Sequence, residues 1–299
     1  MSSPTLFHDE NWPRAASLVQ PSLAESDLAI VGIPASKTSL SQTSAHLTPA
    51  AVRGALARYS TYAASRNADL SKLAITDFGD IESPDFDDGE ARVAEKLKDS
   101  LAHHKLVIAI GGDNSITYSA ARALWADLEN VGVITLDAHH DLRDGKSNGS
   151  PVWRLIQAGL PGTNIVQIGI SDFANSEFYS NRASEAGITI FDRESMRRTS
   201  IASVIANALA IAGANGREIY VDIDVDVCDR SVAPACPASV PGGITADELR
   251  EAAYLLANDE RVRAIDITEI DAALDTPDQR TIRLAALLVL EAGAGLVTR

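Results

Sequence analysis

The chain has 299 residues, a formal net charge of −15 at pH 7, and a hydrophobic content of 45%. This length and hydrophobic content suit one large α/β domain or two smaller ones, and the acidic charge argues against nucleic acid or anionic membranes as partners. Only two cysteines occur, so we expect no disulfide framework and a reducing, cytoplasmic location. We see no signal peptide and no apolar run long enough to span a bilayer.

Strands and helices are predicted to alternate along the chain. Residues 1–25 suggest a loosely structured arm. Apolar runs then predict strands at 28–34, 73–78, 106–110, 165–170 and 262–267, and two more that begin at 131 and 218. Helices are expected at 49–59, 89–103, 116–127, 152–158 and 194–212, after a Thr245–Glu248 capping box, and at the C-terminus. The alternation implies a mainly parallel sheet covered on both faces. No linker or internal repeat divides residues 1–299, so we expect a single domain.

The run that begins at Val131 is apolar and then turns abruptly polar. Asp137, His139 and Asp141 stand at alternate positions, so in an extended backbone their side chains leave on one face. Carboxylates mixed with one imidazole suit Mn²⁺ or a similar divalent ion. The alternative is a solvated loop that follows a strand.

A second apolar strand carries Asp222, Asp224 and Asp226. Burying several carboxylates together without a cation would drive them to lose their charge. The two strands together predict a pair of metal ions about 3.5–4 Å apart. Both clusters follow the carboxyl ends of strands, where open α/β sheets place their sites. Asp222 lies deeper, and we expect it to support the ligands rather than to bind metal.

A third polar segment follows the strand at 106–110. Gly111 and Gly112 permit a close approach of two backbones, and Asn114 and Ser115 stand at the start of the next helix. On these residues alone, Asn114 or Ser115 could simply be a helix N-cap.

These motifs resemble those of the ureohydrolase family, which comprises arginases, agmatinases and formimidoylglutamases. The resemblance covers the chain from about Ile30 to the C-terminus and rests on Gly111–Ser115, Asp137–Asp141 and Asp224–Asp229. It implies a three-layer α/β/α fold and a binuclear manganese centre. It also implies hydrolysis of a C–N bond in a guanidino or amidino group, and assembly into homo-oligomers, as trimers or hexamers.

The resemblance also implies a role for each ligand. Asp137 and Asp224 would bridge both metal ions, His139 and Asp226 would complete one metal site, and Asp141 with Asn114 would complete the other. Most family members carry histidine where this chain has Asn114. An asparagine offers only a neutral carbonyl oxygen, which is a poorer manganese ligand than imidazole.

The remaining predicted site residues concern the substrate. Glu269 aligns with the family's glutamate that holds the cationic amidine, although it could be a surface acid at a strand end. Asp141 could accept a proton from the nucleophilic water and pass it to the leaving nitrogen. Arg143 and Asn148 resemble the formimidoylglutamase pattern rather than that of arginases, and an arginine offers a fork for a carboxylate. The alternative for Arg143 is an ion pair with Asp144 or with another surface acid.

We therefore expect a manganese enzyme that acts on a small amidino substrate with a carboxylate. The leading hypothesis is hydrolysis of N-formimino-L-glutamate to L-glutamate and formamide, as in histidine degradation. The alternatives are a guanidino-acid or agmatinase-like hydrolase that releases urea, and a non-catalytic protein with the same fold, for which Asn114 is the main support.

Overall fold

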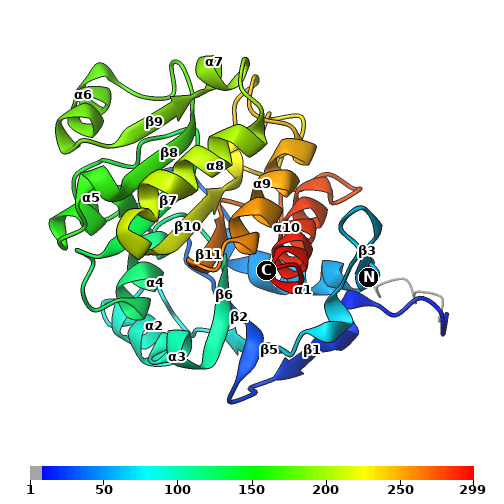
Figure 1. Ribbon diagram of the computed structural model, residues 1–299. Helices are drawn as coiled ribbons and strands as arrows, with labels where there is room; N and C mark the ends of the chain where they lie inside the picture. The colour runs from blue at the N-terminus through cyan, green and yellow to red at the C-terminus, as the bar shows by residue number, and fades with distance from the viewer. Residues whose placement is uncertain (1–8) are drawn as a thin grey trace.

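A nine-stranded sheet in which all neighbouring strands are parallel forms the centre of the protein (Figure 1). The computed structural model describes residues 9–299, so the first eight residues of the expected arm lie outside the described residues. From edge to edge, the strands are β1 (Val19–Pro21), β5 (Ile75–Asp80), β2 (Ser26–Ile33), β6 (His104–Gly111), β11 (Val262–Thr268), β10 (Glu218–Asp224), β7 (Val131–Leu136), β8 (Ile165–Ile170) and β9 (Thr189–Asp192).

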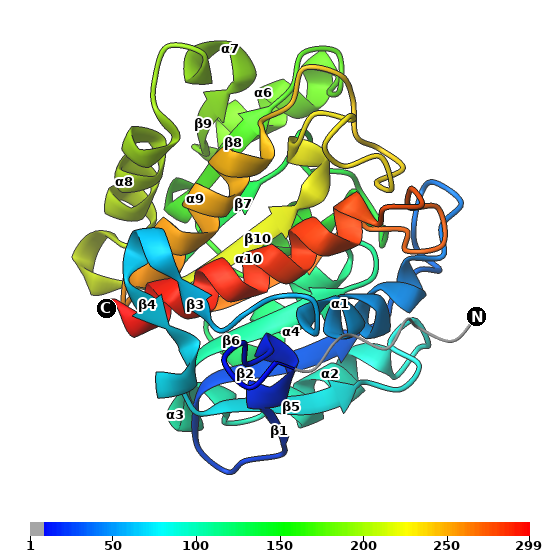
Figure 2. The same cartoon turned by 90° about the vertical axis from the view of Figure 1, so that its right-hand side faces the viewer.

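Helices cover both faces of this sheet, which gives the expected three-layer α/β/α architecture (Figures 1 and 2). One face packs against α1 (Thr48–Leu56), α7 (Arg193–Met196), α8 (Ile201–Ala212), α9 (Ala246–Asn258) and α10 (Arg280–Val297). The other packs against α2 (Gly89–Leu97), α4 (Ile116–Leu124), α5 (Pro151–Gln157) and α6 (Glu177–Ala186). Two short elements, α3 (Ser100–His103) and the hairpin of β3 (Tyr62–Ala63) and β4 (Ala68–Asp69), complete the set.

The central strands are apolar throughout because both of their faces are buried. In β7, Val131 and Val133 face the core on one side of the sheet, while Ile134 and Leu136 face the core on the other. All six residues of this strand are buried. This explains why the apolar runs predicted the strands well.

The structure also differs from the sequence expectations. The predicted arm contains ordered residues: β1 pairs with β5 at the sheet edge. The helix expected at 194–212 is two helices, because Ser200 caps a new helix by accepting a hydrogen bond from the Ser203 N–H. Helix α6 and strand β9 were not predicted, since most of their residues are half-buried or exposed and show no strong period.

His103 and His104 stand in a polar turn before the apolar run at 106–110, so the sequence predicts that both are solvated. For His104 this prediction is wrong, because His104 is the first residue of β6, is buried, and has its Nδ1 2.8 Å from the Ser26 hydroxyl. The neighbouring His103 is exposed.

Candidate active site and metal centre

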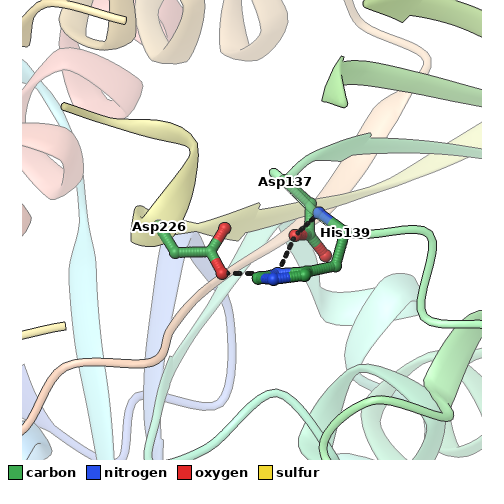
Figure 3. Close-up of side chains that lie close together, drawn as sticks. All are labelled: Asp137, His139 and Asp226. Carbon is green, nitrogen blue, oxygen red and sulfur yellow. Dashed lines mark hydrogen bonds and ion pairs between the residues drawn. The ribbon is translucent and has the colours of Figure 1, made fainter. Parts of the chain in front are cut away.

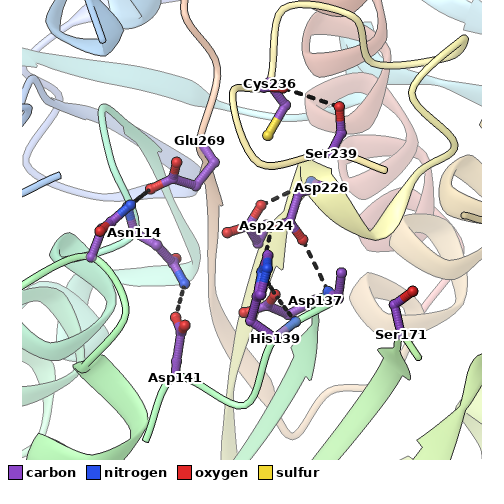
Figure 4. A network of polar contacts seen from close by, with 12 residues as sticks. Asn114, Asp137, His139, Asp141, Ser171, Asp224, Asp226, Cys236, Ser239 and Glu269 are labelled. Atoms are coloured by element: carbon purple, nitrogen blue, oxygen red, sulfur yellow. Dashed lines mark hydrogen bonds and ion pairs between the residues drawn. The ribbon is translucent and has the colours of Figure 1, made fainter. Parts of the chain in front are cut away.

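The order of the strands brings the predicted site residues together. Strands β6, β11, β10 and β7 are consecutive neighbours in the sheet, and the polar segments at their carboxyl ends meet at one edge. Figure 4 shows side chains from all four segments converging there. Asn114 follows β6, Glu269 follows β11, Asp224 ends β10, and Asp137 and its neighbours follow β7.

Asp137, His139 and Asp226 form the first part of the cluster (Figure 3). His139 Nδ1 lies 2.7 Å from Asp226 Oδ2 and 3.4 Å from Asp137 Oδ1. Backbone N–H groups fix both carboxylates: His139 N donates to Asp137 Oδ1 at 2.6 Å, and Ala138 N donates to Asp226 Oδ1 at 2.9 Å. The potential ligand atoms of the three residues lie within 4.8 Å of one another.

Asp224 extends this cluster towards a cysteine that was not predicted. Asp224 Oδ1 accepts a hydrogen bond from Asp226 N at 2.8 Å, and potential ligand atoms of Asp224, Asp226 and Cys236 lie within 4.8 Å of one another. Burial raises the pKa of the Cys236 thiol well above its ordinary value, so the thiol keeps its proton and is a poor ligand. Cys236 belongs to an irregular loop without sequence periodicity, so no signal could have placed it here.

Asn114 and Asp141 lie together on the opposite side of the cluster (Figure 4). Asn114 Nδ2 donates to Asp141 Oδ2 at 2.7 Å, so the amide presents its nitrogen to the acid, and its oxygen faces away. Asp141 has a positive φ of 54°, which is uncommon for a residue with a side chain and typical of functional sites. The expected pair is therefore present, with the amide turned opposite to the orientation that a metal ligand requires.

The buried acids fit a pair of divalent cations. Burial, together with Asp141 and Asp226, raises the pKa of Asp137 well above its ordinary value, and burial with Asp226 and Asp137 does the same for Asp224. Asp137 Oδ2 is sealed from solvent and has no hydrogen-bond partner among residues 9–299. A cation would compensate both effects, since it keeps the carboxylates ionised and engages the free oxygen. Oxygen ligands with one imidazole are a donor set suited to manganese.

His139 and Asp226 influence each other's protonation. Burial alone would lower the pKa of His139, but contact with Asp226 raises it to about 10. In the same way, burial would raise the pKa of Asp226, while His139 lowers it below the ordinary value. Without a metal, the two side chains therefore form an ion pair, and a metal ion would replace the imidazole proton.

Glu269 is a buried residue of the site rather than a surface acid. Its Oε1 accepts hydrogen bonds from Asn114 N at 2.7 Å and from Asn148 Nδ2 at 2.9 Å. Its Oε2 has no hydrogen-bond partner within the described part of the chain, and the residue lines the cavity over the cluster. Burial raises the pKa of Glu269 to about 8, and a cationic group placed beside it would lower that pKa and favour the ionised carboxylate.

A cavity of about 340 Å³ opens beside the cluster. Arg143, Asn148 and Tyr179 line it together with His139, Asp141, Asp224, Asp226 and Glu269. Arg143 has no ion pair with any residue in 9–299, whereas Asp144 pairs with Arg182 at 2.9 Å. A Cβ on Gly149 would lie 2.8 Å from Arg143 Cδ, so glycine there leaves room for the arginine side chain.

Two further residues lie behind or beside the cluster. Asp222 is fully buried and, as expected, deeper than Asp224, and neither of its oxygens has a hydrogen-bond partner among residues 9–299. His140 is buried, and its Nδ1 lies 2.7 Å from Gln167 Oε1. His140 alternates with the predicted ligands His139 and Asp141 and contributes to packing behind them.

The family is decided by a comparison of the whole chain. The model of the arginase family matches residues 26–294. The chain belongs to the arginase family. Among its relatives within that family, the formimidoylglutamase of Halalkalibacterium halodurans is 35% identical over 270 residues, which is 87% of this chain and 84% of the relative. The formimidoylglutamase of Bacillus subtilis is 34% identical over 277 residues, or 90% of this chain and 86% of the relative.

Solved structures of the arginase family share the fold. The crystal structure of B. subtilis formimidoylglutamase superimposes with a TM-score of 0.91 and 31% identity, covering 99% of this chain and 95% of that one. The formiminoglutamase of Trypanosoma cruzi, solved with Mn²⁺, gives a TM-score of 0.87 at 25% identity and covers 96% of this chain and 99% of that one. The predicted resemblance and the arginase-like fold are thus confirmed.

Proposed function

We propose that this protein is a manganese-dependent formimidoylglutamase, which hydrolyses N-formimino-L-glutamate to L-glutamate and formamide. The observation that carries the substrate assignment is Arg143: it lines the cavity beside the acid cluster and has no acidic partner among residues 9–299. The alternative role was an ion pair with Asp144 or another surface acid, but Asp144 pairs with Arg182 instead. A free guanidinium fork in an acidic cavity is suited to a substrate carboxylate. The relatives named above support the same assignment.

Six side chains would hold the two metal ions: Asp137 and Asp224 between them, His139 and Asp226 at one, and Asp141 and Asn114 at the other. When bound, a manganese pair supplies a Lewis acid and lowers the pKa of a water molecule. No part of the chain between residues 9 and 299 offers another such set of acids and imidazole with a cavity beside it.

The residues around the cavity divide the remaining work. Glu269 Oε2, which is free to face the cavity, holds the cationic amidine, and the hydrogen bonds to Oε1 fix its direction. Asp141 accepts a proton from the attacking water and returns it to the nitrogen that leaves as the amine of glutamate. Water oxygen becomes the carbonyl oxygen of formamide, and the bond from the amidine carbon to the glutamate nitrogen breaks. Arg143 anchors a carboxylate and so aligns the amidine.

A formamide-release assay tests this assignment. Protein preloaded with manganese is expected to hydrolyse N-formimino-L-glutamate. Arginine, agmatine and guanidinobutyrate, whose hydrolysis is measured as urea release, are expected to be poor substrates. Arg143→Ala should lower kcat/KM about a hundredfold, because a charge-assisted fork contributes about 3 kcal/mol. Lys146→Ala is the matched control, since this exposed lysine of the same loop pairs with Glu90 and does not line the cavity.

Each other outcome would overturn the assignment in a different way. Release of urea from arginine or agmatine, with no formamide, would indicate a guanidino hydrolase. Inactivity with two manganese ions bound would redirect the search to other amidino compounds. Inactivity without bound metal would favour a non-catalytic protein.

We further propose a homo-oligomer, a trimer or hexamer, as the family resemblance implies, and a cytoplasmic location, as the low cysteine count predicts. No helix in residues 9–299 combines the length and the apolar character needed to cross a membrane. Light scattering on purified protein would measure the number of subunits.

A further inference from the structure

A chain of buried hydrogen bonds lies behind Asn114, on the side away from the cavity. Asn114 Oδ1 accepts from the Thr268 hydroxyl at 2.8 Å and lies 3.0 Å from the Thr117 hydroxyl. Thr117 Oγ1 also lies 2.8 Å from Asp266 Oδ2, to which the Tyr220 hydroxyl donates. Asn114, Thr117, Thr268, Asp266 and Tyr220 are all at most 1% exposed. Water therefore does not compete for these contacts.

This network of buried hydrogen bonds has fewer protons than acceptor positions. The Thr117 hydroxyl has one proton but two oxygens within reach, Asn114 Oδ1 and Asp266 Oδ2. When the proton goes to Asp266, Thr117 Oγ1 turns a lone pair towards Asn114 and needs a donor there. The Thr268 hydroxyl has Asn114 Oδ1 as its only hydrogen-bond acceptor among residues 9–299.

The amide of Asn114 can therefore lie in two orientations. In the orientation observed, Nδ2 faces Asp141 (Figure 4). Oδ1 faces the hydroxyls of Thr117 and Thr268. In the opposite orientation, Oδ1 faces the cluster and Nδ2 donates to Thr117 Oγ1. The second orientation satisfies Thr117 but leaves the buried Thr268 proton without an acceptor, which is unfavourable.

We propose that Thr268 and Thr117 are positioning residues that set the affinity of the metal site at Asn114, and that they act in opposite directions. An amide binds a metal ion only through its oxygen, so the ion requires the second orientation. Thr268 holds the oxygen away from the metal and weakens binding. Thr117, whose proton is engaged by Asp266, accepts from Nδ2 and strengthens binding. The observed arrangement is the metal-free state, and the side-chain amide of Asn114 rotates by about 180° when the ion binds.

This inference rests on one element of the proposed function, the role of Asn114 as a ligand, and does not involve the substrate. Its test is to measure manganese binding to the full-length native protein and its variants. Calorimetry gives the affinities, and the exchange-coupled EPR signal reports the manganese pair. Thr268→Val should bind the second manganese ion about threefold to tenfold more tightly, and Thr117→Val more weakly by a similar factor, as expected for one buried hydrogen bond. Opposite signs from two identical substitutions are the expected result.

Two controls separate this effect from damage to the fold. Thr135→Val changes another fully buried threonine whose hydroxyl has no hydrogen-bond partner among residues 9–299, so it should leave both affinities within twofold. In an Asn114→His background there is no amide to turn, and both threonine variants should lose their effect. Changes of the same sign in Thr268→Val and Thr117→Val, or an unchanged effect in the histidine background, would overturn the proposal.

A measurement on the unsubstituted protein covers the case in which a variant does not fold. Neutron diffraction from crystals exchanged into D₂O locates the deuterons on Asn114 Nδ2. We expect them to point at Asp141 without metal and at Thr117 with manganese bound. The same orientation in both states would overturn the proposal, whatever substrate the enzyme prefers.

Discussion

Replacing Asn148 by alanine tests how Glu269 is held in the cavity. Asn148 lines the cavity, and its predicted contact with the substrate stays a prediction. Its Nδ2 donates to Glu269 Oε1 at 2.9 Å, and its Oδ1 accepts from Leu40 N at 3.0 Å. The half-buried side chain thus joins the loop that contains Leu40 to the glutamate. If Glu269 holds the amidine, removing this amide should misdirect the free Oε2 oxygen.

The magnitude follows from what remains after the substitution. A hydrogen bond to a charged group contributes about 1.5–3 kcal/mol. Glu269 Oε1 keeps the hydrogen bond from Asn114 N at 2.7 Å, so the lower end of this range applies. We therefore expect Asn148→Ala to lower kcat/KM by about tenfold, which corresponds to about 1.4 kcal/mol.

Steady-state formamide release, with kcat and KM determined separately, measures this effect. Ser39→Ala is the control, because Ser39 Oγ lies at 3.4 Å from the same Nδ2 and should matter little. An Asn148→Ala enzyme within twofold of the native one would refute the reasoning. A thousandfold loss would refute it too, since it would mean that Asn148 contacts the substrate directly.

Three further predictions concern metal and stability. Burial raises the pKa of Asp141 to about 7 and of Glu269 to about 8, so the metal-free folded protein holds more protons than the unfolded chain from about pH 4 upwards. The Tm of the metal-free protein should therefore fall as the pH rises to about 8, and saturating manganese should reduce this fall. A metal-free Tm that does not change with pH would contradict the prediction. Asp137→Asn should raise the metal-free Tm at pH 8, because it removes a buried carboxylate, and should abolish stabilisation by manganese in the same thermal scans. Gly112→Ala should lower the free energy of unfolding in urea by about 3 kcal/mol or more, because a Cβ there would lie 1.7 Å from the Ala35 carbonyl oxygen. Gly54→Ala should instead raise it by up to about 1 kcal/mol, because Gly54 lies in helix α1 and no atom is within 4 Å of the new Cβ.

The sequence was most informative where one short segment determines the outcome. Asp137 with His139, and Asp224 with Asp226, come close together because each pair lies within one segment at the end of a strand. The extended backbone assumed for them is wrong, since β7 ends at Leu136 and Asp226 lies in the 3₁₀ turn Val225–Val227 after β10. Their roles as metal ligands stay a prediction. The parallel sheet followed from the alternation of apolar runs with helices.

Features that depend on distant residues were not predictable. The orientation of the Asn114 amide depends on Thr268, which is 154 positions away in the chain. Cys236 reaches the cluster from an irregular loop, and the break before α8 depends on the capping by Ser200 rather than on any change in apolar period. Such contacts form only when the elements pack together, so no local pattern records them.

The strand order determines when the site can assemble during synthesis of the chain. Strands β10 and β11 lie between β6 and β7, although they follow both in the chain, so the two earlier strands are not neighbours in the sheet. The chain leaves the ribosome from its N-terminus, so Asn114 and Asp137 emerge well before Asp224 and Glu269. These four residues can meet in one site only after about residue 269 has left the exit tunnel. The full set of ligands for manganese therefore becomes available only after the four strands β6, β11, β10 and β7 have assembled, whereas α10 (Arg280–Val297) follows the last residue of the site.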